Sequence, residues 1–107
     1  MNKSTKEIKI SIIYVAGPYS NGDVAVNVAN AIKVGMDIND IGDYAVVPHL
    51  THFMHMLCPR PYKYWLRLDN LIIPKCDKLV RLPGKSSGAD AEVKLAQSFN
   101  IPCEEWI

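Results

Sequence analysis

The sequence predicts an α/β fold, a single-domain three-layer α/β/α sandwich around a parallel sheet of four to five strands. Apolar runs with many β-branched residues alternate with segments of helical period, and Gly, Pro or Asn marks each change. The chain has 107 residues, of which 49% are hydrophobic and 21% charged, enough for one compact core. We expect one domain over residues 1–107, with residues 1–7 as a flexible tail.

Four apolar segments have the character of strands. The first reads KISIIYVA and ends at Gly17 and Pro18, which is typical of a buried strand before a turn. The last reads IPCEEWI, and its two glutamates suit a strand at the edge of a sheet. The expected strands cover residues 9–16, 44–48, 77–83 and 101–107.

Helical periodicity fills the intervals between these strands. From Val24 the apolar residues repeat at helical spacing until Gly42 ends the pattern. A second helix is expected over 61–73, with Pro61 as its first residue and Pro74 as its stop. Residues 49–60 read as a loop with a short helical piece, and a last helix follows the loop at 83–87. One face of the first helix carries Val24, Val28, Ala31, Gly35 and Ile38.

The alternation of strands and helices implies a parallel sheet that is covered on both faces. We expect a Rossmann-like or flavodoxin-like arrangement with the strand order 2-1-3-4. In such sheets ligands bind beyond the carboxyl ends of the strands. The loops at 17–23, 48–60 and 83–87 therefore form the candidate site.

Charge and cysteine usage exclude several classes of protein. The formal net charge of +1 predicts no binding of nucleic acid, and no apolar run approaches the roughly 20 residues that span a bilayer. The three cysteines, Cys58, Cys76 and Cys103, are odd in number and widely spaced, which fits a reduced cytoplasmic compartment. We expect a small-molecule partner, with neither nucleic acid nor membrane.

Glu92 lies where a helix should present apolar side chains. Ala89, Val93 and Ala96 form the apolar stripe of the last helix, and Glu92 falls on the same side near its start. Asp90 has a local explanation, because the residues from Ser87 to Asp90 match a capping box. Glu92 either bends out to water as a first-turn acid or serves a site.

Asp69 shows the same anomaly on the middle helix, where it lies one turn after Trp65. Two carboxyls on apolar faces are what the chemistry of glycosidic bonds uses, one to attack and one to assist departure. The start of a helix favours ionised Glu92, so we expect Asp69 to hold the proton. The alternative is a structural aspartate bonded to nearby backbone.

The loops add polar groups and close backbone approach. Ser86, Ser87 and Gly88 before a helix offer an anion site. The three histidines read H-x-x-H-x-x-H, a spacing that brings two rings together on a helix but turns the third away. We therefore expect no metal and no cofactor, and a histidine in the wall of the pocket.

Four segments together resemble the nucleoside 2-deoxyribosyltransferase-like superfamily, and most of all its small bacterial and phage members. They read YVAGPYS, the helix of Asp69, CDKLVRLPG and SSGADAE, and the similarity runs from about residue 9 to 101. The resemblance implies that Glu92 is the nucleophile on C1′, that Asp69 is the acid or base for the nucleobase, and that Tyr14 orients Glu92.

Ser86 looks more like the branch of 2′-deoxynucleoside 5′-phosphate N-hydrolases, in which a serine helps hold the phosphate. That branch carries an arginine where this chain has Ser20. The chain lacks the C-terminal extension of the transferases, so we expect hydrolysis rather than transfer. The expected substrate contacts are Gly17, Pro18, Tyr19, Ser20, His49, His52, Trp65, Ser86, Ser87 and Gly88.

Two other classes stay open from the sequence. One is a catalytically silent nucleotide-binding module of the same fold. The other is an interaction or metal-binding protein that uses the histidine segment. We also expect a homodimer or higher homo-oligomer, because Ala25, Ala29 and Met36 form a second apolar strip on the first helix.

Overall fold

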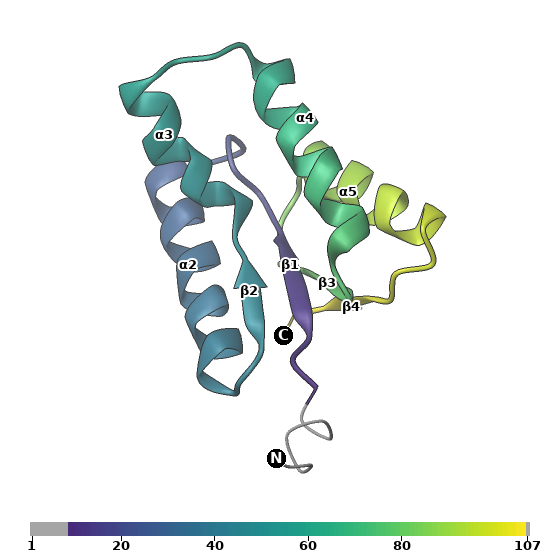
Figure 1. The fold of residues 1–107 in the computed structure, drawn as a ribbon. Coiled ribbons are helices and arrows are strands. Elements are labelled where there is room, and N and C mark those ends of the chain that lie inside the picture. Colours follow the sequence, from purple (N-terminus) through teal and green to yellow (C-terminus); the bar gives the residue numbers. More distant parts are fainter. Residues whose placement is uncertain (1–8, 107) are drawn as a thin grey trace.

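The computed structural model describes residues 9–106 (Figure 1), and the tail expected over 1–7 lies outside the described residues. Strands and helices alternate along this part of the chain, as the sequence predicts. The strands are β1 (Ile12–Ala16), β2 (Tyr44–Val46), β3 (Lys78–Arg81) and β4 (Cys103–Glu105). The α-helices are α2 (Val24–Asp40), α3 (Thr51–Leu57), α4 (Tyr62–Ile72) and α5 (Ser87–Ser98). Two 3₁₀ turns are η1 (Pro48–Leu50) and η2 (Ile73–Lys75).

The sheet has four strands in the order β2-β1-β3-β4, and every neighbouring pair is parallel. The predicted α/β class and strand order are confirmed, with the strands two to four residues shorter than the sequence suggests. Tyr14 of β1 lies between Val46 of β2 and Leu79 of β3 in the register, at the centre of the sheet. The carboxyl ends of the strands all meet at one edge, below α3 and α4 in Figure 1.

Helices cover both faces of the sheet, which makes the three layers (Figure 1). Ile13 and Val15 of β1 face α2 and pack with its Ala31 and Ile38. The alternate residues of β1 face α5. The core on that side contains Tyr14, Ala16, Ile73, Cys76, Leu79, Ala89, Ala96 and Ile101. The predicted stripe of α2 is confirmed, with Val28, Ala31, Gly35 and Ile38 buried and Val24 half-buried.

One helix boundary differs from the sequence prediction. Pro61 is the N-cap of α4 with an extended backbone rather than its first helical residue. The predicted stop at Pro74 is confirmed to within one residue, because α4 ends at Ile72 and Pro74 lies in the 3₁₀ turn η2, where its missing N–H is not needed. Gly42 ends α2 as predicted, since its φ of 101° is open to glycine without strain.

The helices at the carboxyl edge are held differently from α2 and α5. Neither α3 nor α4 has a buried residue. The stripe predicted on α4 is half-buried at Trp65 and Leu68 and reaches the surface at Ile72. These two helices rise above the sheet edge and form a roof over the ends of the strands (Figure 1).

A candidate active site beneath α3 and α4

A short hydrogen bond joins the centre of the sheet to Glu92. The Tyr14 hydroxyl donates to Oε2 of Glu92 at 2.6 Å, and Tyr14 itself has no exposed surface. Tyr14 therefore fills the core with its ring and uses its hydroxyl to hold a carboxyl on α5. The predicted place of Glu92 on the apolar side of α5 is confirmed. Of the two alternatives left open by the sequence, its half-buried side chain turns toward Tyr14 and not out to water.

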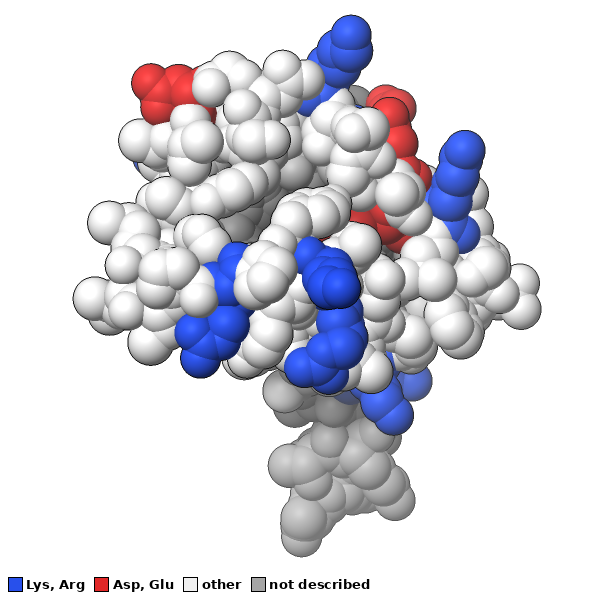
Figure 2. Space-filling view, turned by 90° about the horizontal axis from the view of Figure 1, so that it is seen from above, with Lys and Arg blue, Asp and Glu red and all other residues white. Residues whose placement is uncertain are grey.

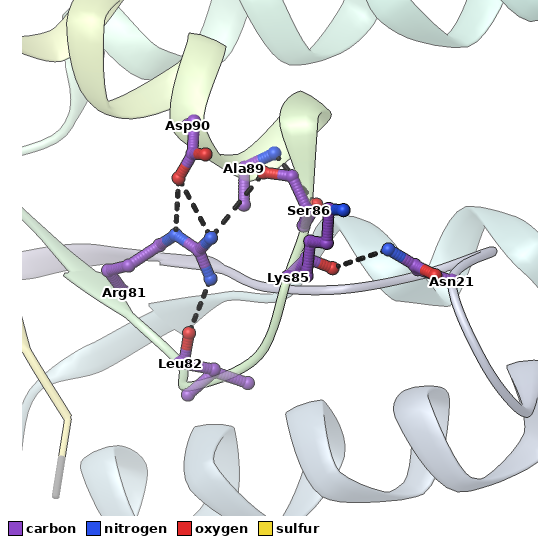
Figure 3. Close-up of polar contacts among 7 residues, drawn as sticks. All are labelled: Asn21, Arg81, Leu82, Lys85, Ser86, Ala89 and Asp90. Atoms are coloured by element: carbon purple, nitrogen blue, oxygen red, sulfur yellow. Dashed lines mark hydrogen bonds and ion pairs between the residues drawn. The ribbon is translucent and has the colours of Figure 1, made fainter.

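The loop that leads into α5 is fixed by its own polar contacts (Figure 3). Ser86 is the N-cap, and its Oγ accepts the N–H of Ala89 at 3.0 Å. The predicted capping box from Ser87 to Asp90 is wrong by one residue. Asp90 instead pairs with Arg81, whose Nη2 lies 2.8 Å from Oδ1. The start of α5 is thus tied to the end of β3.

A second contact binds this loop to the loop after β1. Nδ2 of Asn21 donates to the carbonyl of Lys85 at 3.0 Å (Figure 3). Gly84 has a φ of 114°, and a Cβ there would lie 2.8 Å from Cγ of Pro18. The two loops therefore pack against each other at a distance that only glycine permits at this position.

Asp69 of α4 is coupled to Glu92. Burial raises the pKa of Asp69 to about 6, while the neighbouring Glu92 opposes the rise. Burial also raises the pKa of Glu92 to about 7; the Tyr14 hydroxyl opposes that rise and the Asp69 charge adds to it. Tyr14 stays neutral, because burial and then the Glu92 charge raise its pKa further above the ordinary value. The three groups form one unit in which two acids compete for one proton.

Burial raises the pKa of both acids, so the pair keeps a proton near neutral pH. Glu92 is in the second turn of α5, and the favourable effect of a helix start fades within the first turn. The group that favours ionised Glu92 is therefore the Tyr14 hydroxyl rather than the helix start. The expectation that Asp69 holds the proton stays a prediction.

A pocket of about 690 Å³ opens over this pair, with α3, α4 and the two loops as its walls. In Figure 2, which looks down on this edge, the face is hollowed and consists mostly of uncharged side chains, with acidic atoms visible in a recess. The predicted site residues that line the pocket are Gly17, Tyr19, Ser20, His49, His52, Trp65, Asp69, Ser86, Ser87, Gly88 and Glu92.

Two predicted site residues stand behind the pocket wall. Tyr14 reaches the site only through Glu92. Pro18 faces a separate cavity of about 260 Å³ between α2 and the end of β3, and its carbonyl bonds the ring of His49. The prediction that Pro18 lines the pocket is therefore wrong, since its ring packs against the position of Gly84.

Several lining residues were missed by the sequence prediction. The pocket also includes Asn21, Pro48, Thr51, His55, Arg60, Tyr62, Leu66 and Ala89. Arg60 is the one Lys or Arg among the described residues that line it. The sequence could have indicated this residue, because Arg60 lies between two prolines in one of the loops expected at the carboxyl edge of the sheet.

Gly88 leaves space that no protein group occupies. A Cβ at this position would meet nothing nearer than the Oγ of Ser86 at 4.0 Å. Glycine early in a helix lowers stability relative to alanine by roughly 1 kcal/mol. Packing therefore gives no reason for glycine here, whereas close approach of a ligand to the backbone of α5 does.

Each histidine of the H-x-x-H-x-x-H segment bonds to a different part of the wall. His49 bonds the Pro18 carbonyl, His52 the Tyr19 hydroxyl and His55 the indole of Trp65. Within residues 9–106 no group of three His, Cys, Asp or Glu side chains is arranged to hold a metal ion.

Comparison with known proteins adds no family. Neither protein-family models nor the sequences of curated proteins match this chain. Over the described part of the chain, no helix has the length and apolar character needed to cross a membrane.

The raised pKa values predict that the free energy of unfolding decreases as pH rises. An acid whose folded pKa is raised from 4.5 to about 7 stabilises the fold when protonated, and this contribution is lost as pH rises through 7. Glu92→Gln stays neutral, so its free energy of unfolding should exceed that of the wild type by about 1–3 kcal/mol at pH 8 and by much less at pH 5.

Thermal unfolding monitored by circular dichroism between pH 5 and pH 8 measures this difference. Glu105→Gln, on the exposed face of β4, is the matched control and should show no such trend. A constant difference between Glu92→Gln and the wild type across this range would contradict a desolvated Glu92.

Proposed function

We propose that the chain cleaves the N-glycosidic bond of a nucleoside, deoxynucleoside or nucleoside 5′-monophosphate, with Glu92 as the nucleophile. The observation that carries this proposal is the 2.6 Å bond from Tyr14 to Glu92 beside a second, coupled carboxyl. A carboxyl with a purely structural role is normally paired with a cation. Here the nearest partners are a phenol and another acid, and both acids line a pocket of ligand size.

The chemistry follows from the arrangement of the three groups. Ionised Glu92 attacks C1′, and the bond between C1′ and the base nitrogen breaks with its electron pair on the nitrogen. A proton from Asp69 neutralises the departing base. Water then attacks C1′ of the glycosyl ester, with Asp69 now accepting a proton, and returns free Glu92 and the sugar.

The Tyr14 hydroxyl has a defined part in this sequence. Its hydrogen bond stabilises the ionised form of Glu92 and points one carboxylate oxygen into the sheet, which leaves the other for the sugar. Because Tyr14 is neutral and immobile in the core, it fixes the direction of attack without itself exchanging a proton.

Hydrolysis rather than transfer is the proposed class, since a pocket of about 690 Å³ leaves room for water beside a bound sugar. We also propose a cytoplasmic location, which the three free cysteines support. A catalytically silent binding module of the same fold is the second candidate. The free space beside the backbone of Gly88 suits a binding module as well as an enzyme. The two neighbouring acids, Asp69 and Glu92, favour the enzyme.

Glu92→Gln should abolish base release while the protein stays folded. The amide keeps the shape and accepts the Tyr14 hydrogen bond, but it is a poor nucleophile, so the rate should fall at least about a hundredfold. The assay is chromatography of free base after incubation with 2′-deoxynucleosides, ribonucleosides and their 5′-monophosphates. Glu105→Gln should retain full activity. Unchanged activity in Glu92→Gln would exclude this mechanism. If the wild type binds these substrates without cleaving any of them, the catalytically silent module is favoured instead.

Asp69→Asn should discriminate between leaving groups. Unmodified bases need a proton to depart, whereas a 7-methylated purine is already cationic and leaves without one. The rate should therefore fall roughly a hundredfold for ordinary nucleosides and only a few-fold for the methylated ones. The basic limb of the pH–rate profile should also disappear. Equal losses for both substrate kinds would assign Asp69 a structural role.

We further propose that the chain is a homodimer. Exposed apolar side chains gather on the roof more than on the strip expected along α2, with Phe53, Met54, Met56 and Leu57 on α3 and Tyr62 on α4. Light scattering at micromolar concentration should give at least twice the 12.0 kDa of one chain. Leu57→Glu should reduce the mass to one chain and Lys94→Glu on α5 should not. A wild-type mass of 12.0 kDa would contradict the dimer.

A further inference from the structure

The histidine segment is the one sequence motif that the proposed chemistry leaves unused. His49 lies in η1, and His52 and His55 lie in α3. Successive members are three residues apart, so each ring points in a different direction from the last. This spacing, which is poor for a metal, suits three separate contacts with the surrounding walls.

On one side the segment holds the loop after β1. The ring of His49 is buried, and its Nε2 lies 3.0 Å from the Pro18 carbonyl. Nδ1 of His52 lies 2.7 Å from the Tyr19 hydroxyl, and the two rings meet edge to face. Tyr19 is partly exposed and lines the pocket, so these contacts set the orientation of an aromatic ring at the ligand.

On the other side His55 holds the first turns of α4. Its Nδ1 accepts the indole N–H of Trp65 at 2.9 Å and the backbone N–H of Arg60 at 3.2 Å. The rings of His55 and Trp65 meet edge to face. A nitrogen that accepts two N–H donors must present its lone pair, so the proton of neutral His55 is on Nε2.

The hydrogen bond from Trp65 to His55 matters for the position of α4 because few other contacts hold the first turns of this helix. No residue of α4 is buried, so packing alone does not determine how its first turns lie over the pocket. Trp65 lines the pocket one turn before Asp69 on the same helix. The guanidinium groups of Arg60 and Arg67 lie 5.5 Å and 5.7 Å from the ring centre of Tyr64, which stiffens the same turns.

We propose that His52 and His55 are positioning residues that set Tyr19 and Trp65 as the aromatic walls of a subsite for a planar heteroaromatic ring. Aromatic side chains receive such rings by stacking. The inference rests on the proposed function, since the ring is the nucleobase that leaves. It extends that function by assigning base recognition to the histidine segment.

The test uses adenine as the probe and compares two substitutions at one position. In His55→Leu the acceptor is lost, whereas in His55→Asn the side-chain oxygen can replace Nδ1. Met56→Leu, on the exposed side of the same helix, is the control. All three are made in a Trp106→Phe background, which leaves Trp65 as the one tryptophan of the two in the chain.

Two measurements are made, and neither requires catalysis. The indole N–H resonance of Trp65 reports its hydrogen bond, and quenching of Trp65 fluorescence reports adenine binding. We expect His55→Leu to move the resonance upfield and to weaken adenine binding about tenfold, the loss of one or two hydrogen bonds. His55→Asn should keep the resonance and bind within about threefold of the wild type, and Met56→Leu should match the wild type.

The outcomes separate this inference from the proposed function. Adenine binding that follows the His55 pattern supports the subsite even if no nucleoside is cleaved. Cleavage by the wild type with unchanged adenine binding in His55→Leu would overturn the subsite and leave the chemistry standing. Failure of His55→Asn to restore binding, or no binding by the wild type at millimolar adenine, would also overturn it.

Discussion

The hydrogen bond between Tyr14 and Glu92 is the contact on which the site depends. A half-buried carboxyl without a donor would be neutral or would turn to solvent, because desolvation opposes its charge. Tyr14 supplies the donor from a fully buried position at the centre of the sheet. The register of β1, the position of α5 and the direction of Glu92 are therefore determined together, and moving any one of them would break the bond.

The rest of the site divides into a rigid floor and a lightly packed roof. The floor consists of the strand ends, the start of α5 and the two loops that the Asn21 contact and the close approach of Gly84 to Pro18 hold together. The roof consists of α3 and α4, which contribute Trp65 and Asp69 to the pocket. A polar contact from His52 to Tyr19 connects the roof to the floor, and the contact from His55 to Trp65 joins the two helices of the roof.

What the sequence predicted and what it missed follow from the range of the interactions. Periodicity is local, so neighbouring residues sufficed to predict the buried stripe of α2, the parallel sheet and the place of Glu92 on the apolar side of α5. Ser86 rather than Ser87 is the N-cap, and Asp90 pairs with Arg81, nine residues earlier in the chain, instead of closing a capping box. The role of His55 depends on its hydrogen bond with Trp65, which lies ten residues later in the next helix, and no pattern in the sequence predicts this contact. The raised pKa of each acid depends on burial, which three-dimensional packing alone decides.

The lack of buried side chains in α3 and α4 has a consequence for how the molecule opens. Segments with little buried apolar area unfold locally at a small cost in free energy, while a central strand opens only with the whole domain. In the Leu57→Glu chain, whose roof no second copy would cover, amide protons of α3 and α4 should thus exchange with solvent far faster than those of β1. Brief excursions of the two helices would then open the pocket, while Glu92 on the floor keeps its place.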